Sequence, residues 1–127
     1  MAVSAAIMCL ALNVYFEARG EDLLGQLAVA EVTLNRVASP KYPDDVCGVV
    51  WQKNQFSWTH DGKSDKPKDK EAWARALYVA QVALETEDMV VVGEDVTHYH
   101  ATYARPYWAK HLKRVAQVGN HIFYERG

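Results

Sequence analysis

The sequence predicts an α+β fold, with a mainly helical domain followed by a small antiparallel β-sheet. Three long segments in the first two thirds of the chain carry apolar residues at helical spacing and have helix start or stop signals at their ends. After Gly93 the pattern changes to alternation and then to a Gly-Asn turn, which is typical of a β-hairpin. Half of the 127 residues are hydrophobic, so we expect a single domain, spanning residues 1–127, around one packed core.

The first two helices are predicted from their caps. Ser4 can cap a helix that runs to about Phe16 and is apolar nearly all round, which indicates a buried, central helix. Gly20 follows as a helix stop. Asp22 caps the second helix, which ends before Pro40 because proline disfavours helical backbone in the residue before it.

The middle of the chain predicts short elements and one more helix. Residues 49–51 are expected to form a short strand, and residues 55–59 a strand or an ordered loop. Residues 60–70 are dense in charge and read as a solvated surface loop. Asp69 caps a third long helix that continues through Glu87, with an apolar stripe for the core.

The last third predicts the sheet. Residues 96–101 alternate as a strand does, and residues 108–112 form a short helical turn. Residues 115–118 and 121–124 then pair as a hairpin around the Gly119-Asn120 turn.

Composition excludes several function classes. The net charge of −2 lacks the basic footprint of a nucleic-acid binder, and the high hydrophobic content excludes a disordered chain. No apolar run approaches the roughly 20 residues that a membrane helix needs, so no stable membrane association is expected. Cys9 and Cys47 could form one bridge, but two small buried side chains are the favoured interpretation.

Glu17 is the sharpest candidate for chemistry. It lies at the end of an apolar helix beside Tyr15 and Phe16, where partial burial would raise the pKa of its carboxyl group. A carboxyl that stays protonated near neutral pH is what a general acid needs. The alternative is a helix-end glutamate paired with Arg19.

Three further polar residues lie nearby in the sequence. Glu21 could be the second carboxylate of a glycosidase pair, although an acid favoured by the dipole of the second helix is the preferred interpretation. Glu31 is expected on the solvent-facing side of that helix. Gln26 is either a buried amide with hydrogen-bond partners or part of a groove.

The aromatic residues outside the helices suit a glycan groove, because their faces stack on sugar rings. They are Phe56, Trp58, Tyr99, Tyr103, Tyr107 and Trp108. The alternative is that they close a small core. We favour the groove for Phe56 and Tyr99, and the core for Trp108.

His98 and His100 share one face of a predicted strand, a spacing that a metal ion could use. A third ligand is not evident among His60, His111 and His121, so hydrogen-bonded or surface histidines are favoured and no metal is expected.

Several ordered blocks together resemble a known family. They are Leu12–Glu21 (LNVYFEARGE), Gly25–Ala30, Leu34–Val37, Tyr42-Pro43 with Val46–Val50, Gln55–Ser57, Thr97–His100 and Gly119–Tyr124. Taken together they are similar to the catalytic domain of the SleB/CwlJ-type cell wall hydrolases, and the resemblance spans nearly the whole chain.

This resemblance implies a lysozyme-like domain that cleaves peptidoglycan as a lytic transglycosylase. Glu17 aligns with the family's catalytic acid, which protonates the bond between N-acetylmuramic acid and N-acetylglucosamine and then helps to close a 1,6-anhydro ring. No cofactor is then required, and peptidoglycan glycan strands are the expected partner of a monomer. The expected groove residues are Gln26, Phe56, Tyr99, Asn120 and His121.

The N-terminal apolar stretch runs directly into the Glu17 block and lacks a preceding basic residue, so it does not read as a cleaved signal peptide. We therefore expect a phage endolysin that waits in the host cytoplasm until lysis and then acts on peptidoglycan in the periplasm. Two alternatives stay open: an amidase using a metal at His98 and His100, and a glycan-binding module without activity.

Overall fold

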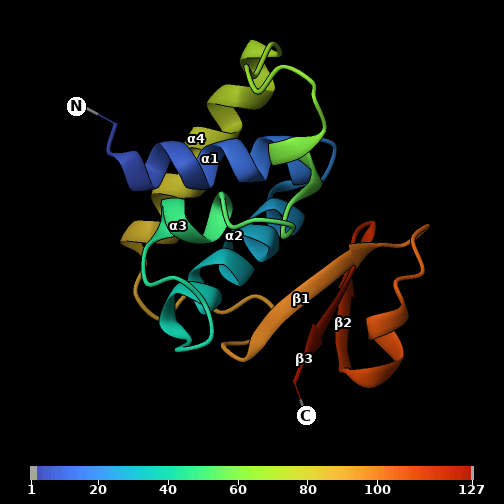
Figure 1. Cartoon of the computed structure of the whole chain (residues 1–127). Coiled ribbons are helices and arrows are strands. Elements are labelled where there is room, and N and C mark those ends of the chain that lie inside the picture. Colours follow the sequence, from blue (N-terminus) through green and yellow to red (C-terminus); the bar gives the residue numbers. More distant parts are fainter. Residues whose placement is uncertain (1–2, 127) are drawn as a thin grey trace.

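Helices form the first part of the molecule and a three-stranded antiparallel sheet forms the last, in a computed structural model that describes residues 3–126 (Figure 1). The helices are α1 (Ala5–Ala18), α2 (Leu23–Ala38), α3 (Val46–Val50) and α4 (Lys70–Glu85), with 3₁₀ turns η1 (Ser57–His60) and η2 (Tyr107–His111). The strands are β1 (Val96–Ala101), β2 (Lys113–Val118) and β3 (His121–Glu125). The predicted α+β class is confirmed.

The three long helices begin where their caps predict. The side chains of Ser4, Asp22 and Asp69 accept hydrogen bonds from backbone amides three residues on, at 3.0 to 3.1 Å. The first helix continues past its predicted end to Ala18, and α4 ends at Glu85, two residues early. These two added residues of α1 matter because they make Glu17 part of the helix.

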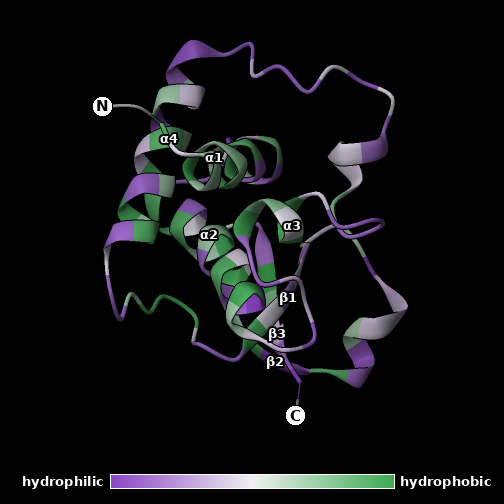
Figure 2. Ribbon diagram, turned by 60° about the vertical axis from the view of Figure 1, so that its left-hand side comes forward, coloured by the Kyte–Doolittle hydropathy of each residue, from purple (hydrophilic) through white to green (hydrophobic). Residues whose placement is uncertain are grey.

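α1 packs against α2, α3 and α4, and hydrophobic residues gather where these helices meet (Figure 2). No helix within residues 3–126 combines the length and apolar character needed to cross a membrane.

The strand predicted at residues 49–51 is wrong. A run of valines resembles a strand, but Asp45 caps a short helix by accepting a hydrogen bond from the Gly48 amide at 3.2 Å. Val46, Val49 and Val50 are buried by this helix. For residues 55–59 the sequence allowed a strand or an ordered loop; the structure has no strand there, and residues 57–59 belong to the η1 turn.

Helix α3 also corrects the interpretation of the cysteines. Cys9 on α1 and Cys47 on α3 form a disulfide, with their Cα atoms 5.3 Å apart. The sequence could not reveal that a helix, rather than a strand, would turn Cys47 toward α1.

The sheet has the strand order β1-β3-β2, and the predicted hairpin of β2 and β3 is confirmed. Tyr99 pairs with Phe123 and His100 with Ile122, so successive side chains of β1 alternate between two faces. The inner face packs on α2, where Phe123 and Val96 join a cluster with Val29. The outer face carries both histidines of β1.

Candidate active site

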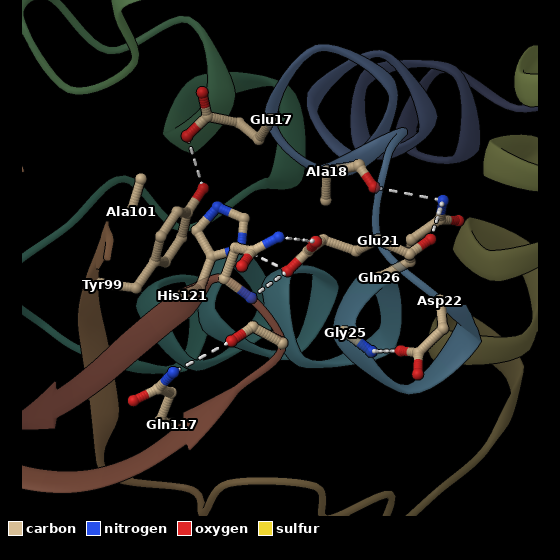
Figure 3. A network of polar contacts seen from close by, with 12 residues as sticks. Glu17, Ala18, Glu21, Asp22, Gly25, Gln26, Tyr99, Ala101, Gln117 and His121 are labelled. Atoms are coloured by element: carbon tan, nitrogen blue, oxygen red, sulfur yellow. Dashed lines mark hydrogen bonds and ion pairs between the residues drawn. The ribbon is translucent and has the colours of Figure 1, made fainter. Parts of the chain in front are cut away.

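Glu17 lies in the last turn of α1 and faces the inner side of β1. The Tyr99 hydroxyl donates a hydrogen bond to Oε1 of Glu17 at 2.6 Å, while the second carboxylate oxygen points away from Tyr99 (Figure 3). Glu17 also lines a cavity of about 430 Å³ together with Phe16 and Trp58. One oxygen is therefore fixed by the protein, and the carboxyl group borders space that a ligand could occupy.

The alternative pairing of Glu17 with Arg19 is wrong. Nη1 of Arg19 donates to the Tyr15 hydroxyl at 2.8 Å, and its guanidinium lies 4.9 Å from the centre of the Tyr15 ring. The Arg19 guanidinium is therefore bound to Tyr15, and the hydrogen-bond partner of Glu17 is Tyr99.

Burial raises the pKa of the Glu17 carboxyl, because the charged form is poorly solvated there. The hydrogen bond from Tyr99 and the charges of His121 and Arg36 act in the opposite direction and offset part of this rise. The net direction is upward, which favours the protonated form that a general acid uses.

Tyr99 lies between Glu17 and the hairpin. Its ring meets His121 edge-on, with the centroids 5.3 Å apart (Figure 3). It also lies 5.6 Å from the Phe123 ring. Burial and the neighbouring Glu17 carboxylate raise the pKa of Tyr99 well above its usual value, so its hydroxyl stays protonated and can donate.

Arg36 is a site residue that the sequence did not single out. It is buried on α2, its Nε donates to the Thr97 carbonyl oxygen at 2.9 Å, and its guanidinium lies over the rings of Tyr42 and Phe56. Burial lowers its pKa, while the Glu17 carboxylate opposes that change. Its place in the Leu34–Val37 block was the available signal.

Glu21 binds the β-hairpin rather than facing open space. Its Oε1 accepts a hydrogen bond from the Asn120 amide at 2.6 Å and lies 3.3 Å from Nδ1 of His121, while its Oε2 accepts from Nδ2 of Asn120 at 3.3 Å (Figure 3). Asp22, not Glu21, caps α2. Glu21 therefore ties the turn between β2 and β3 to the junction of α1 and α2.

The predicted groove residues divide by burial. Tyr99, Asn120 and His121 gather in the network around Glu17 and Glu21, and their contact with a glycan stays a prediction. Gln26 and Phe56 are enclosed, at 0% and 3% exposed, which favours positioning over direct contact. The sequence cannot show how deeply a side chain is covered, so direct contact of these two residues with a glycan stays a prediction.

Gln26 has a clear structural role. Its Nε2 donates to the carbonyl oxygens of Ala18 and Glu21 at 3.2 and 3.3 Å, so it holds the backbone of the α1–α2 turn (Figure 3). Phe56 lies beneath the Arg36 guanidinium, 5.1 Å from ring centre to Cζ.

The expectation that Glu31 faces solvent is wrong. Its side chain is buried and accepts hydrogen bonds from the amides of Val91 and Val92, the shortest at 2.8 Å. Glu31 thereby holds the segment that enters β1, a role that depends on residues 60 positions away.

His98 and His100 form an aromatic cluster on the outer face of the sheet. Trp108 lies 5.2 and 5.7 Å from their ring centres, and the Tyr124 hydroxyl lies 2.8 Å from Nε2 of His100. Burial lowers the pKa of His98 to about 4. Within the described part of the chain, no three His, Cys, Asp or Glu side chains gather in a way that could hold a metal ion.

Comparison with known proteins decides the family. Residues 20–124 match the sequence profile described as cell wall hydrolase. The chain belongs to this family. The profile begins three residues after Glu17, but the matching solved structures cover 98% of the chain.

Two of these structures are similar to this chain over nearly their whole length. One is described as the catalytic domain of the germination-specific lytic transglycosylase SleB from Bacillus anthracis, with a TM-score of 0.76, 30% identity and 97% of that chain covered. The other is the catalytic domain of Bacillus cereus SleB, with a TM-score of 0.71, 28% identity and 93% of that chain covered.

Curated relatives are longer proteins. The spore cortex-lytic enzyme of Halalkalibacterium halodurans is 35% identical over 117 residues, which is 92% of this chain but 34% of that protein. The spore cortex-lytic enzyme of Bacillus subtilis is 32% identical over 119 residues, or 94% of this chain and 37% of that protein. The chain thus spans about a third of the length of these relatives.

Proposed function

We propose that this cell wall hydrolase is a lytic transglycosylase that cleaves the β-1,4 bond between N-acetylmuramic acid and N-acetylglucosamine, with Glu17 as its single acid and base. The observation that carries the proposal is the Glu17 carboxyl itself, partly buried, raised in pKa and bordering a cavity. The likeness to the SleB catalytic domain, described as a lytic transglycosylase, supports the same reaction class.

The reaction needs one group that first gives and then takes a proton. The Glu17 carboxyl donates its proton to the glycosidic oxygen as the bond from that oxygen to C1 breaks. The resulting carboxylate takes the proton of the muramoyl C6 hydroxyl, whose oxygen bonds to C1 and closes the 1,6-anhydro ring. The Tyr99 hydroxyl, 2.6 Å from Oε1, stabilises the carboxylate between these steps.

The surroundings of Glu21 favour this scheme over a two-carboxylate hydrolysis. A second carboxylate would act as a base toward water or as a nucleophile. Both oxygens of Glu21 instead accept hydrogen bonds from Asn120.

Product analysis tests the reaction. Purified sacculi digested with the protein should yield 1,6-anhydromuramoyl products by mass spectrometry. New reducing ends without anhydro products would identify a hydrolase. Released stem peptides would identify an amidase. Binding without any products would identify a glycan-binding module. Each of these three outcomes would overturn the proposal.

Tyr99→Phe tests the role of the tyrosine. We expect a roughly ten-fold loss in kcat/KM, because a hydrogen bond to a charged group is removed. That hydrogen bond lowers the pKa of Glu17, so its loss should move the alkaline limb of the pH profile upward. A rate loss with an unmoved alkaline limb would assign Tyr99 a purely structural role.

The proposed setting is lysis of a host cell by a phage endolysin, with peptidoglycan as the target. The relatives named above are spore cortex-lytic enzymes, so an experiment has to separate the two settings. Expressed inside a Gram-negative cell, the protein should lower culture turbidity only after the inner membrane is permeabilised. Digestion of spore cortex with no effect on vegetative sacculi would contradict the endolysin role.

A further inference from the structure

The charged connection between η1 and α4 forms a wall of the cavity that contains Glu17. The sequence indicates only a solvated loop there, and Figure 2 shows it as mostly hydrophilic. Lys63, Lys66 and Lys68 nevertheless line the same 430 Å³ cavity as Glu17. A ligand positioned at the acid therefore also meets this loop.

Two residues hold the loop against α1, one at each end of it. Before it, Trp58 is buried, donates from Nε1 to Oδ1 of Asn13 at 2.8 Å, and stacks on Phe16 with centroids 4.9 Å apart. After it, the Asp69 amide donates to the Tyr15 hydroxyl at 3.0 Å. These contacts fix the loop between η1 and α4 to the end of α1 that carries Glu17.

The charge of this wall is not balanced by its own acids. Arg19 and the three lysines face two aspartates, Asp61 and Asp65, around the cavity. Within residues 3–126 the ion pairs are Lys113–Glu125 and His121–Glu21, so none involves a lysine of this loop. The wall is positive although the whole chain carries −2, and an anionic group is what such a wall attracts.

We propose that Lys63, Lys66 and Lys68 form a subsite for the carboxylates of the peptide stems that peptidoglycan carries on its muramoyl residues. The inference rests on the proposed function, because it assumes that a glycan strand binds with a muramoyl residue at Glu17. The sugars of that strand are uncharged, so its negative charge lies on the stems. Lysine side chains on an exposed loop suit this recognition, since they can follow stems of different conformation.

The test compares two substrates that differ in their stems. One is a set of soluble peptidoglycan fragments with intact stems. The other is the same fragments after an amidase has removed the stems, which leaves one lactyl carboxylate beside each muramoyl ring in place of the stem carboxylates. The variant replaces Lys63, Lys66 and Lys68 by Gln. We expect the variant to have a roughly ten-fold lower kcat/KM on the stemmed substrate, because charge-assisted contacts between the lysines and the stem carboxylates are lost. Its kcat/KM on the stripped substrate should be unchanged.

A matched control replaces Lys41, Lys53 and Lys110 by Gln. These lysines are also exposed, lie outside the cavity and change the net charge equally, so activity on both substrates should be retained. Replacing the three loop lysines by Arg should preserve the preference for stems. The preference of the wild type should also weaken as salt is added.

An equal loss on both substrates, or no loss on either, would overturn the stem subsite. The proposed function fails differently, because anhydro products would then be missing from wild-type digests of both substrates. The two failures are therefore distinguished by product analysis of the wild type.

Discussion

Replacing Glu17 by Gln is expected to reduce kcat/KM on peptidoglycan by about 10³-fold or more, because the same carboxyl serves both proton transfers. Glutamine keeps the size of the side chain, and its carbonyl oxygen can still accept the hydrogen bond from Tyr99. The measurement is initial-rate kinetics on soluble fragments. A Glu17→Gln protein with full activity would disprove the site.

The same variant should be no less stable than the wild type near neutral pH. Burial raises the pKa of Glu17 in the folded state above its ordinary value of 4.5. The stability that this shift contributes is complete below the unfolded-state pKa and is lost as pH rises through the folded-state pKa. In thermal unfolding measured against pH, the Tm of the wild type should therefore decrease relative to that of Glu17→Gln as the pH rises from the unfolded-state pKa through the folded-state pKa. A lower Tm for the variant at neutral pH would instead make Glu17 a structural residue.

The fold was largely predictable because its signals are local. Ser4, Asp22 and Asp69 each cap a helix through an amide three residues away, which a sequence shows directly. The Gly119-Asn120 turn is equally local, and Gly119 takes a φ of 56° that favours glycine. Helix α3 was missed since its valines have strand propensity, and burial against other helices overrode that preference.

The candidate acid could be found for the same reason, since the apolar neighbours of Glu17 precede it on one helix. The partners of the two glutamates could not be found in this way. Tyr99 contacts Glu17 from 82 positions away in the sequence, and Asn120 contacts Glu21 from 99 positions away. The choice between a catalytic and a structural Glu21 depended on that second contact.

Burial explains why Glu31 was misplaced. Glu31 is a polar residue on an amphipathic helix, and only the packing of the segment before β1 decides that it is covered. For Gln26 the structure favours the buried amide with hydrogen-bond partners, one of the two alternatives that the sequence left open. The lysines of the η1–α4 connection are exposed, as their charge predicts. The sequence does not show that the contacts at either end of this connection place them on a wall of the cavity.

The tie between Glu21 and the hairpin leads to a second large effect, on stability. Glu21→Ala is expected to lower the free energy of unfolding by about 2–3 kcal/mol, because hydrogen bonds to a charged group are lost. Glu21→Gln should lose less, since an amide oxygen can still accept from Asn120. Glu71→Ala, at an exposed position of α4, is the surface control and should change stability little. Denaturant unfolding measures all three.

Gly119 provides an independent check of that tie. A Cβ atom there would lie 2.5 Å from Oε1 of Glu21, so Gly119→Ala should be destabilising both by its positive φ and by this contact. The contact disappears in Glu21→Ala, whereas the backbone cost remains. A double-mutant cycle should therefore show a smaller effect of Gly119→Ala in the Glu21→Ala protein, and equal effects in both would refute the contact.

Activity of Glu21→Ala then separates the two glutamates. If Glu21 only holds the hairpin, the folded variant should keep activity within about ten-fold of the wild type. The remaining loss would arise because His121, which contacts both Glu21 and the Tyr99 ring, then positions Tyr99 less firmly at Glu17. If Glu21 were instead a second catalytic carboxylate, its removal would cost as much rate as Glu17→Gln. An inactive but stable Glu21→Ala protein would require a two-carboxylate mechanism, because a single acid and base at Glu17 would then not suffice.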